Sequence, residues 1–465
     1  MKRNWSWKTT AALLSVMVGS SFFCRMILNA LQEPLQAGMG LTDNQVALVQ
    51  GTAMALPAVL GGVPVGLLVD RFNRARLLSV FCLLNLAGTL AMALSTSLSS
   101  LLVSRAIVGF STAAVAIAVP SLLADLFPRS QRGRGSMIYG VSQVVGMAMA
   151  FAAGGVLVTT FHSADAWRLG ILVMSCPLLA ALLISFLLRE QERMEIAEER
   201  PTLGKSCVEL WSYRSVVVPL FSGVVAIGLA DGATLVWVVP TLSRSFGMSA
   251  GYANSVMGIA LVVGGLLGPV LGGLAADRCL NSGGAARAMA LLASLGALSA
   301  ALGMFALAPG PVFASICLTA FILVGSMMIS VTLTLVTVLL PNELRGFCVS
   351  VLSVGQILLS FGLAPSLVSI TAAQMGGLAG VGNALAIVCG TASVISGAAF
   401  LFGREHLQRQ HAARENSNGR ADVNPLRNRP GGRYTGQPVR MADQILARAE
   451  GDPVPLEDAR VNRHS

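Results

Sequence analysis

The chain has 465 residues, of which 54% are hydrophobic and 12% are charged, and its mean hydropathy is +0.71. A soluble domain could not bury this much apolar surface, so the composition excludes a soluble protein and indicates that lipid surrounds much of the chain. The formal net charge is +10. Because the basic residues stand in segments between apolar runs, we predict no nucleic-acid partner and treat the charge as a signal of membrane topology.

Apolar runs of roughly 20 residues or more recur along the chain, separated by short polar breaks, and a run of this length spans a bilayer core of about 30 Å as an α-helix. We therefore predict an all-α polytopic membrane protein. The twelve predicted transmembrane helices lie at 10–32, 44–69, 77–97, 99–127, 135–160, 166–188, 215–239, 250–276, 286–308, 311–340, 347–370 and 381–402.

Three basic residues, Lys2, Arg3 and Lys8, precede the first run and give it the look of a signal peptide. Because the run is long and further spans follow, we predict an uncleaved first helix.

Most basic residues lie in segments between the predicted helices or at the chain ends. If the number of helices is even, these segments all fall on the same face of the membrane. By the positive-inside rule both termini are cytoplasmic, and we expect the plasma membrane, the inner membrane of a bacterium. Membrane lipids with anionic headgroups are expected contacts of this basic face.

The chain's cysteines stand apart, without the C-x-x-C spacing of a redox or metal site, and its four histidines do not cluster. The sequence therefore predicts no disulfide framework, no metal and no cofactor. No nucleophile with a base and no phosphate-binding Walker sequence can be assembled, so we predict that the protein is not an enzyme and is not driven directly by ATP.

Two short sequences occur twice, about half a chain apart. Gly66 to Arg71 is matched by Gly273 to Arg278, and Pro128 to Gly133 is matched by Pro341 to Gly346. Such repeats are typical of secondary transporters. We predict two related six-helix halves at 1–189 and 215–403, a cytoplasmic central loop at 190–214, and a disordered cytoplasmic tail at 404–465.

The sequence Gly-x-x-x-Asp-Arg-x-x-Arg at 66–74 resembles the signature of the major facilitator superfamily. Arg105-x-x-x-Gly109 and the pair Trp167-Arg168 are further similarities, and the resemblance covers about residues 10–403. With Arg25, the stretch 41–71 is similar to the Spinster-like branch and to organic-anion carriers. This chain has Cys24 and Thr112 where acidic residues are common in that branch, and Asn73 where glycine is usual. The resemblance implies two pseudo-symmetric bundles whose helices 1, 4, 7 and 10 line a central cavity.

Three charged residues lie inside predicted spans, namely Arg25, Arg105 and Asp231. A charged side chain in mid-bilayer costs about 3 kcal/mol, so each should face protein or water and have a partner. We predict that the two arginines bind an anionic or zwitterionic solute, because the planar guanidinium matches a carboxylate or a phosphate. Asp231 would pair with one arginine in the empty site and could accept a proton. The alternative is that these residues only hold helices together.

Polar residues in the spans are candidate cavity liners, namely Asn29, Gln143 and Gln356. Hydrogen bonds between helices are an equally good interpretation.

The repeated segments are predicted to form a conformational latch. The resemblance implies that Asp70 and Asp277 dock at the N-termini of helices 11 and 5 of the other half, where a carboxylate is stabilised by roughly 0.3–1 kcal/mol. The latch would hold the outward-open state and break as the halves rock. The alternative is that these charges only set topology. The latch set is Gly66, Asp70, Arg71, Arg74, Arg132, Gly273, Asp277, Arg278 and Arg345.

We therefore predict a secondary active transporter, acting as a monomer, that moves a small or amphipathic organic anion by alternating access, with possible coupling to protons or another ion. A transport-inactive membrane sensor on the same scaffold and a uniporter without ion coupling are the alternatives. The sequence gives neither the solute nor the direction of transport.

Overall fold

The computed structural model describes residues 7–128, 131–161, 165–190 and 203–422. Eleven segments of this described part are long and apolar enough to cross a membrane. One of them, Ala250–Leu307, contains a reversal at Gly283 and Gly284, where Gly284 has a φ of 63°. Divided at this point, it supplies two crossings, so the prediction of an all-α protein with twelve transmembrane helices is confirmed.

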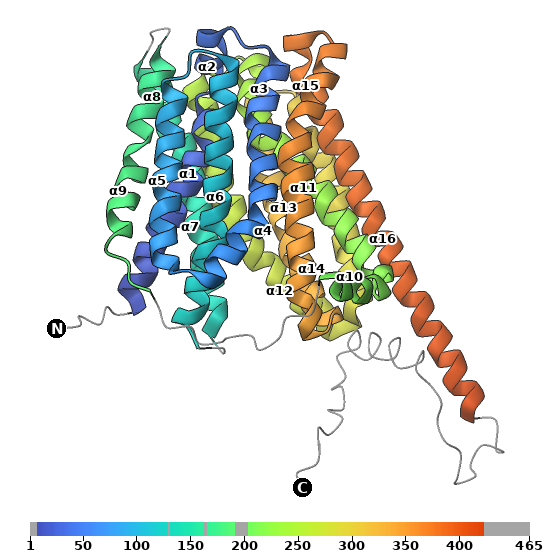
Figure 1. The fold of residues 1–465 in the computed structure, drawn as a ribbon. Coiled ribbons are helices and arrows are strands. Elements are labelled where there is room, and N and C mark those ends of the chain that lie inside the picture. Colours follow the sequence, from blue (N-terminus) through green and yellow to red (C-terminus); the bar gives the residue numbers. More distant parts are fainter. Residues whose placement is uncertain (1–6, 129–130, 162–164, 191–202, 423–465) are drawn as a thin grey trace, which may run out of the picture.

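The first group of helices follows the chain from blue to green (Figure 1). Its elements are α1 (Trp7–Ala30), α2 (Gln32–Met39), α3 (Asp43–Gln50), α4 (Thr52–Arg71), α5 (Arg74–Ala93), α6 (Leu98–Leu126), α7 (Arg132–Thr160), α8 (Ala166–Met174) and α9 (Cys176–Ser185).

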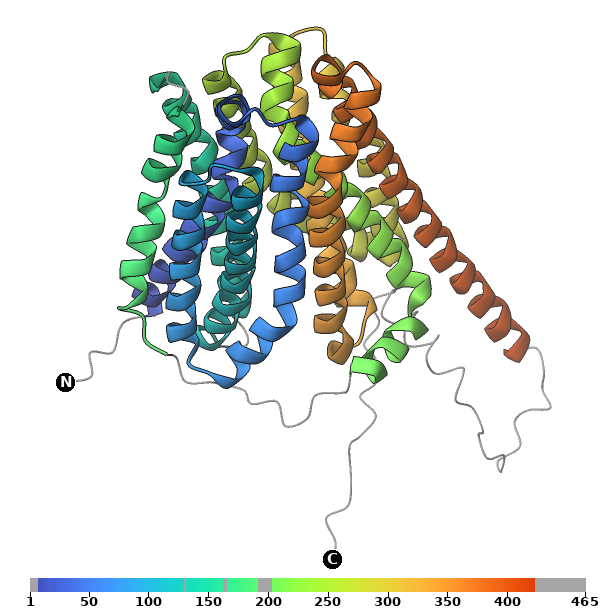
Figure 2. The same ribbon diagram turned by 45° about the horizontal axis from the view of Figure 1, so that its top comes forward.

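The second group begins with a short helix, α10 (Leu203–Ser212), in the segment predicted as the central loop. It continues with α11 (Arg214–Phe246), α12 (Ala250–Leu302), α13 (Pro311–Leu339), α14 (Asn342–Gly355), the π-helix η3 (Gln356–Leu363), α15 (Ala364–Gln374) and α16 (Val381–Asp422), with short 3-10 helices at Gly303–Leu307 and Gly377–Gly380. The two groups stand side by side in both views (Figures 1 and 2).

The predicted tail begins inside a helix. α16 continues to Asp422, well past the boundary set at 404. The residues just beyond 404 include Glu, Gln, Arg and Ala, which favour a helix, so a helix that has already begun can continue through them. The rest of the tail, 423–465, lies outside the described residues.

The two faces of the bundle are distinguished by the chain ends. α1 begins and α16 ends on one face, here called the terminal face, while α2, α3 and the end of α15 lie at the other, here called the opposite face (Figure 1). An even number of crossings requires this arrangement.

Local sequence explains several helix ends. The Thr42 side chain accepts a hydrogen bond from the Gln45 backbone N–H in a capping box, which begins α3. Asn73, which stands where the resembled signature has glycine, caps α5 by accepting from the Arg76 backbone N–H at 2.9 Å.

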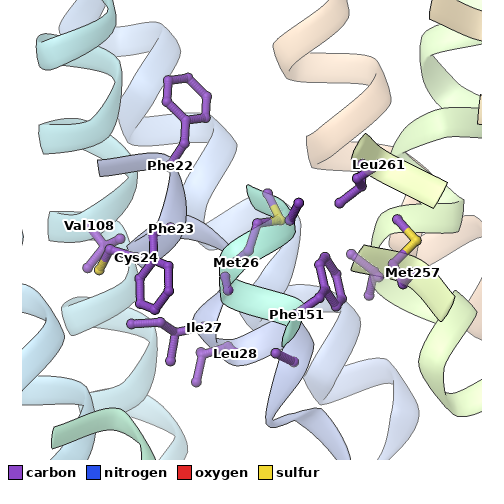
Figure 3. Packing of buried hydrophobic residues seen from close by; sticks show 14 of the residues in the cluster. Phe22, Phe23, Cys24, Met26, Ile27, Leu28, Val108, Phe151, Met257 and Leu261 are labelled. Atoms are coloured by element: carbon purple, nitrogen blue, oxygen red, sulfur yellow. The ribbon is translucent and has the colours of Figure 1, made fainter. Parts of the chain in front are cut away.

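The two groups pack closely along α7 and α12. Figure 3 shows Phe151 of α7 pointing toward Met257 of α12, beside buried residues of α1. A second contact joins α4 to η3, where the Thr52 hydroxyl donates to the Gly362 carbonyl oxygen at 3.1 Å. η3 is a π-helix, a kind of helix that is rare and often marks a functional segment.

Candidate functional site

A cavity of about 640 Å³ lies between the two groups of helices. Its walls come from α1, α4, α6, α7, α14 and η3. On α4, α6 and α14 the lining residues stand between the middle of the bundle and the terminal face, as Val63, Ile117 and Val349 do. The cavity is therefore placed toward the terminal face, and both groups contribute to it.

The bundle is closed on the opposite face by an ion-pair network. Arg244, in the last turn of α11, contacts Asp43 at 3.3 Å and Glu33 at 3.6 Å, and donates to the Gln36 side-chain oxygen at 2.9 Å. One cation of the second group thus bridges two carboxylates of the first. We call these four residues the outer gate.

Two asparagines add hydrogen bonds between the groups on this side. The Asn29 amide donates to the Leu235 carbonyl oxygen at 2.8 Å, and the Asn254 amide donates to the Ala30 carbonyl oxygen at 3.1 Å. Asn29 does not line the cavity. Of its two interpretations, the structure favours a hydrogen bond between helices.

Arg25 lines the cavity from α1. Its guanidinium carbon lies 4.1 Å from the centre of the Phe361 ring on η3 and 5.9 Å from the Phe22 ring, so the cation stacks against an aromatic residue of the other group. The buried Nε atom has no hydrogen-bond partner. Within the described chain, no carboxylate forms an ion pair with Arg25.

Arg105 supports Arg25 and does not line the cavity. It is 1% exposed, and its Nη2 donates to the Arg25 backbone carbonyl oxygen at 3.0 Å, while Nε and Nη1 have no partner. This favours the interpretation that Arg105 ties α6 to α1. The Arg105-x-x-x-Gly109 motif has a second role, since a Cβ at Gly109 would collide with the Met54 carbonyl oxygen of α4.

The two positions where acidic residues are common in the resembled branch hold uncharged residues. Cys24 is fully buried and its sulfur lies 2.6 Å from the Thr89 hydroxyl. Thr112 lines the cavity. The arginine pair therefore keeps its positive charge next to the cavity without a carboxylate of its own in the described chain.

Asp231 is placed apart from both arginines. It lies on α11 against α13, so close that a Cβ at Gly325 would stand 2.9 Å from the carboxylate Oδ1. It is not a lining residue. No hydrogen bond or ion pair to Asp231 occurs within the described residues, so the predicted pairing with an arginine is not present in this conformation.

Of the other two candidate liners, Gln143 of α7 and Gln356 of η3 both line the cavity. Sequence reasoning missed Tyr139, Ser353 and Phe361, which also line it. Periodicity alone could not find them, because the rotation of each helix depends on its neighbours. Sequence reasoning also missed Arg244, which stands in the last turn of α11.

The predicted latch residues lie near the terminal face, and in this conformation a new Cβ at Gly66 or Gly273 would have no atom within 4 Å. Asp70 and Arg71 end α4, Arg132 begins α7, Asp277 and Arg278 lie in α12, and the Arg345 Nε of α14 donates to the Leu340 carbonyl oxygen.

Arg74 forms ion pairs with Asp125 at the end of α6 and with Glu190, and the Glu190 carboxylate also accepts from the Ala75 backbone N–H. These contacts join α5, α6 and the segment after α9.

Acidity at the opposite face should favour the closed outer gate. Burial raises the pKa of Glu33, and Arg244 only partly offsets this effect. The closed gate therefore binds a proton more tightly than an open gate in which Glu33 is exposed, and lowering the pH through this pKa should shift the protein toward closure. Pulsed EPR distances between spin labels at Ala37 and Tyr252 measure the shift. A Glu33→Gln variant that kept the same pH dependence would contradict this origin.

Comparison with known proteins identifies the family. The model of the Major Facilitator Superfamily matches residues 13–361. A D-xylose transporter of Levilactobacillus brevis is 30% identical over 128 residues, 28% of each chain, and a facilitated trehalose transporter of Apis mellifera ligustica is 28% identical over 188 residues, 40% of this chain and 36% of that one. The matched regions thus span about a third of these two relatives.

Solved structures show the same fold over nearly the whole chain. A bacterial homologue of the human lysosomal transporter Spinster, in an inward-facing and unoccupied conformation, has a TM-score of 0.73 and 19% identity and covers 87% of this chain and 98% of that one. At this identity the likeness concerns the fold.

Proposed function

Because the chain belongs to the Major Facilitator Superfamily, whose members are multi-pass membrane transporters and not enzymes, we propose that it is a secondary active transporter of a small or amphipathic organic anion. The observation that carries this proposal is Arg25, a cation that lines the cavity and has no carboxylate partner among the described residues.

The electrostatics of the cavity favour an anion. Arg25 lines the cavity, and the buried Arg105 guanidinium donates a hydrogen bond to the Arg25 backbone carbonyl oxygen, so two cationic residues stand next to each other at the cavity wall. Burying uncompensated charge is costly, and an incoming carboxylate or phosphate would supply the missing counter-charge. Arg25 would bind it with its planar fork, while Phe361 holds the ring-stacked side chain in place.

The solute would reach this site by alternating access. The outer gate closes the opposite face in this conformation, and the cavity lies toward the terminal face. The nine latch residues would close the terminal face in the other conformation. A Cβ at Gly66 or Gly273 would contact nothing in the present conformation. This supports the proposal, because a glycine at these positions would then allow the two groups of helices to approach closely in the other conformation.

The orientation follows from the basic segments. If the terminal face is cytoplasmic in a bacterial inner membrane, this conformation is open toward the cytoplasm. We propose that the transporter acts as a monomer.

Asp231 is the candidate group for proton coupling, because it is an acidic residue inside a membrane span and has no hydrogen bond or ion pair among the described residues. Asp231→Asn should remove the stimulation of uptake by a pH gradient and leave exchange of solute across the membrane near the wild-type rate. Proteoliposome uptake with and without the gradient measures this. Glu209→Gln, which removes an exposed acid on α10, is the matched control. Gradient-driven uptake by the Asp231→Asn variant would exclude this role.

A neutral sugar is the second candidate solute, because two relatives are named for D-xylose and trehalose transport. Gln143, Gln356 and Tyr139 could form hydrogen bonds with sugar hydroxyl groups. Uptake by proteoliposomes of a panel of carboxylates, phosphate esters and neutral sugars separates the candidates. Anion uptake supports the proposal, and uptake of sugars alone would contradict it. Solute binding without exchange of any compound would instead favour the sensor.

A further inference from the structure

A second cavity, of about 730 Å³, lies between α1, α7 and α9. We call it the lateral groove. Its lining is aliphatic and aromatic apart from three serines, and it contains no charged residue. The groove is separate from the central cavity, with which it shares no lining residue.

The lateral groove faces the lipid. On α7 its residues Met137, Val141 and Met149 follow the spacing of one helix face and are 63%, 43% and 57% exposed, whereas Tyr139 and Gln143 of the same helix line the central cavity on another face. Exposed apolar side chains within a membrane-spanning helix contact acyl chains.

The floor of the groove is a close contact of two helices. A Cβ at Gly146 of α7 would collide with the Gly19 carbonyl oxygen of α1, so the two backbones touch there. Pro177 and Ala180 of α9 add small side chains to the wall. The result is a furrow whose apolar sides can hold an extended hydrocarbon chain.

Two cations mark the end of the groove at the terminal face. Lys8 lies seven residues before the lining residue Ser15 on α1, and Arg134 lies seven residues before the lining residue Val141 on α7. Seven residues are nearly two helical turns, so each cation stands on the groove side of its helix. It lies roughly 10 Å nearer the terminal face than the lining residue of the same helix. Both are exposed. The half-exposed Trp7 beside Lys8 is typical of the headgroup level of a membrane.

We propose that the lateral groove is a binding site for an anionic phospholipid, with one acyl chain in the furrow and the phosphate between Lys8 and Arg134. Zwitterionic lipids would fill the same furrow without the full attraction of the two cations. This site does not depend on the identity of the transported solute.

Native mass spectrometry of the full, delipidated chain tests the proposal, with phosphatidylglycerol and phosphatidylcholine of identical acyl chains as probes. The wild type should retain one molecule of phosphatidylglycerol in preference to phosphatidylcholine. Lys8→Gln combined with Arg134→Gln should lower this preference by roughly 25-fold, about fivefold for each cation near an anionic headgroup. Arg76→Gln, an exposed cation at the start of α5, should leave it unchanged.

Filling the furrow tests the acyl-chain part. Val145→Trp should remove the retained lipid of either headgroup, whereas Val156→Trp, at an exposed position of the same helix outside the groove, should not. Equal lipid retention by these two folded variants would overturn the furrow. If Val145→Trp does not fold, the charge variants still decide, because both replace exposed residues. An unchanged headgroup preference in Lys8→Gln combined with Arg134→Gln would overturn the headgroup site.

Discussion

Arg25→Gln should nearly abolish anion uptake in a protein that remains folded and inserted. The change removes the cavity-lining cation and its stacking on Phe361, and leaves an incoming anion without its main counter-charge. Losing one partner of a buried charge pair costs about 2 kcal/mol or more, which lowers solute affinity by roughly 30-fold at least. The uptake rate and the solute affinity of Arg25→Lys should lie between those of the wild type and those of Arg25→Gln, because lysine keeps the charge but lacks the planar fork of arginine. Initial uptake rates and solute binding measure both effects.

Arg105→Gln is the comparison variant. Glutamine can still donate a hydrogen bond to the Arg25 carbonyl oxygen, so we expect a much smaller loss of affinity than in Arg25→Gln. Wild-type uptake by Arg25→Gln at equal surface expression would remove Arg25 from the site.

Arg244→Gln should shift the protein toward a conformation open at the opposite face. Without the guanidinium, Glu33 and Asp43 lose the cation that bridges them and repel each other. The network is only partly exposed, so we expect a change of about 1.4 kcal/mol, roughly tenfold in the ratio of closed to open forms. Pulsed EPR distances between labels at Ala37 and Tyr252 should lengthen.

Arg168→Gln provides the control for the gate. Arg168 pairs with Asp165 and donates to the Ala93 carbonyl oxygen, all within the first group of helices. Its replacement should leave the label distances unchanged. Equal distance distributions in wild type and Arg244→Gln would show that the outer gate does not hold this conformation.

The fold could be predicted from the sequence because lipid imposes a simple rule on the chain. Every backbone polar group in the bilayer must be satisfied within a helix, so each long apolar run becomes one crossing. The ends of these helices were harder to place. α16 continues to Asp422, and the turn at Gly283 and Gly284 is a short reversal between two helices rather than a separate loop.

The candidate site could be predicted only in part. A charge in an apolar run identifies a residue that needs a partner, and this rule found Arg25, Arg105 and Asp231. It does not say which way the residue faces, because packing sets the rotation of each helix. Arg25 lines the cavity, Arg105 holds the backbone of Arg25, and Asp231 lies against α13.

The outer gate shows the opposite difficulty. Arg244 stands at the end of α11 in the last turn before Gly247, where a basic residue is unremarkable in sequence. Its importance arises only because the fold brings Glu33 and Asp43 from the other group of helices within reach.

Solute counterflow in proteoliposomes tests recognition of negative charge in the cavity most directly. Each anion found to be transported is compared with its own neutral amide, which has nearly the same size and shape. We expect exchange of the anion and no exchange of the amide, with the difference lost in Arg25→Gln. Equal exchange of anion and amide by the wild type would contradict an arginine-centred anion site.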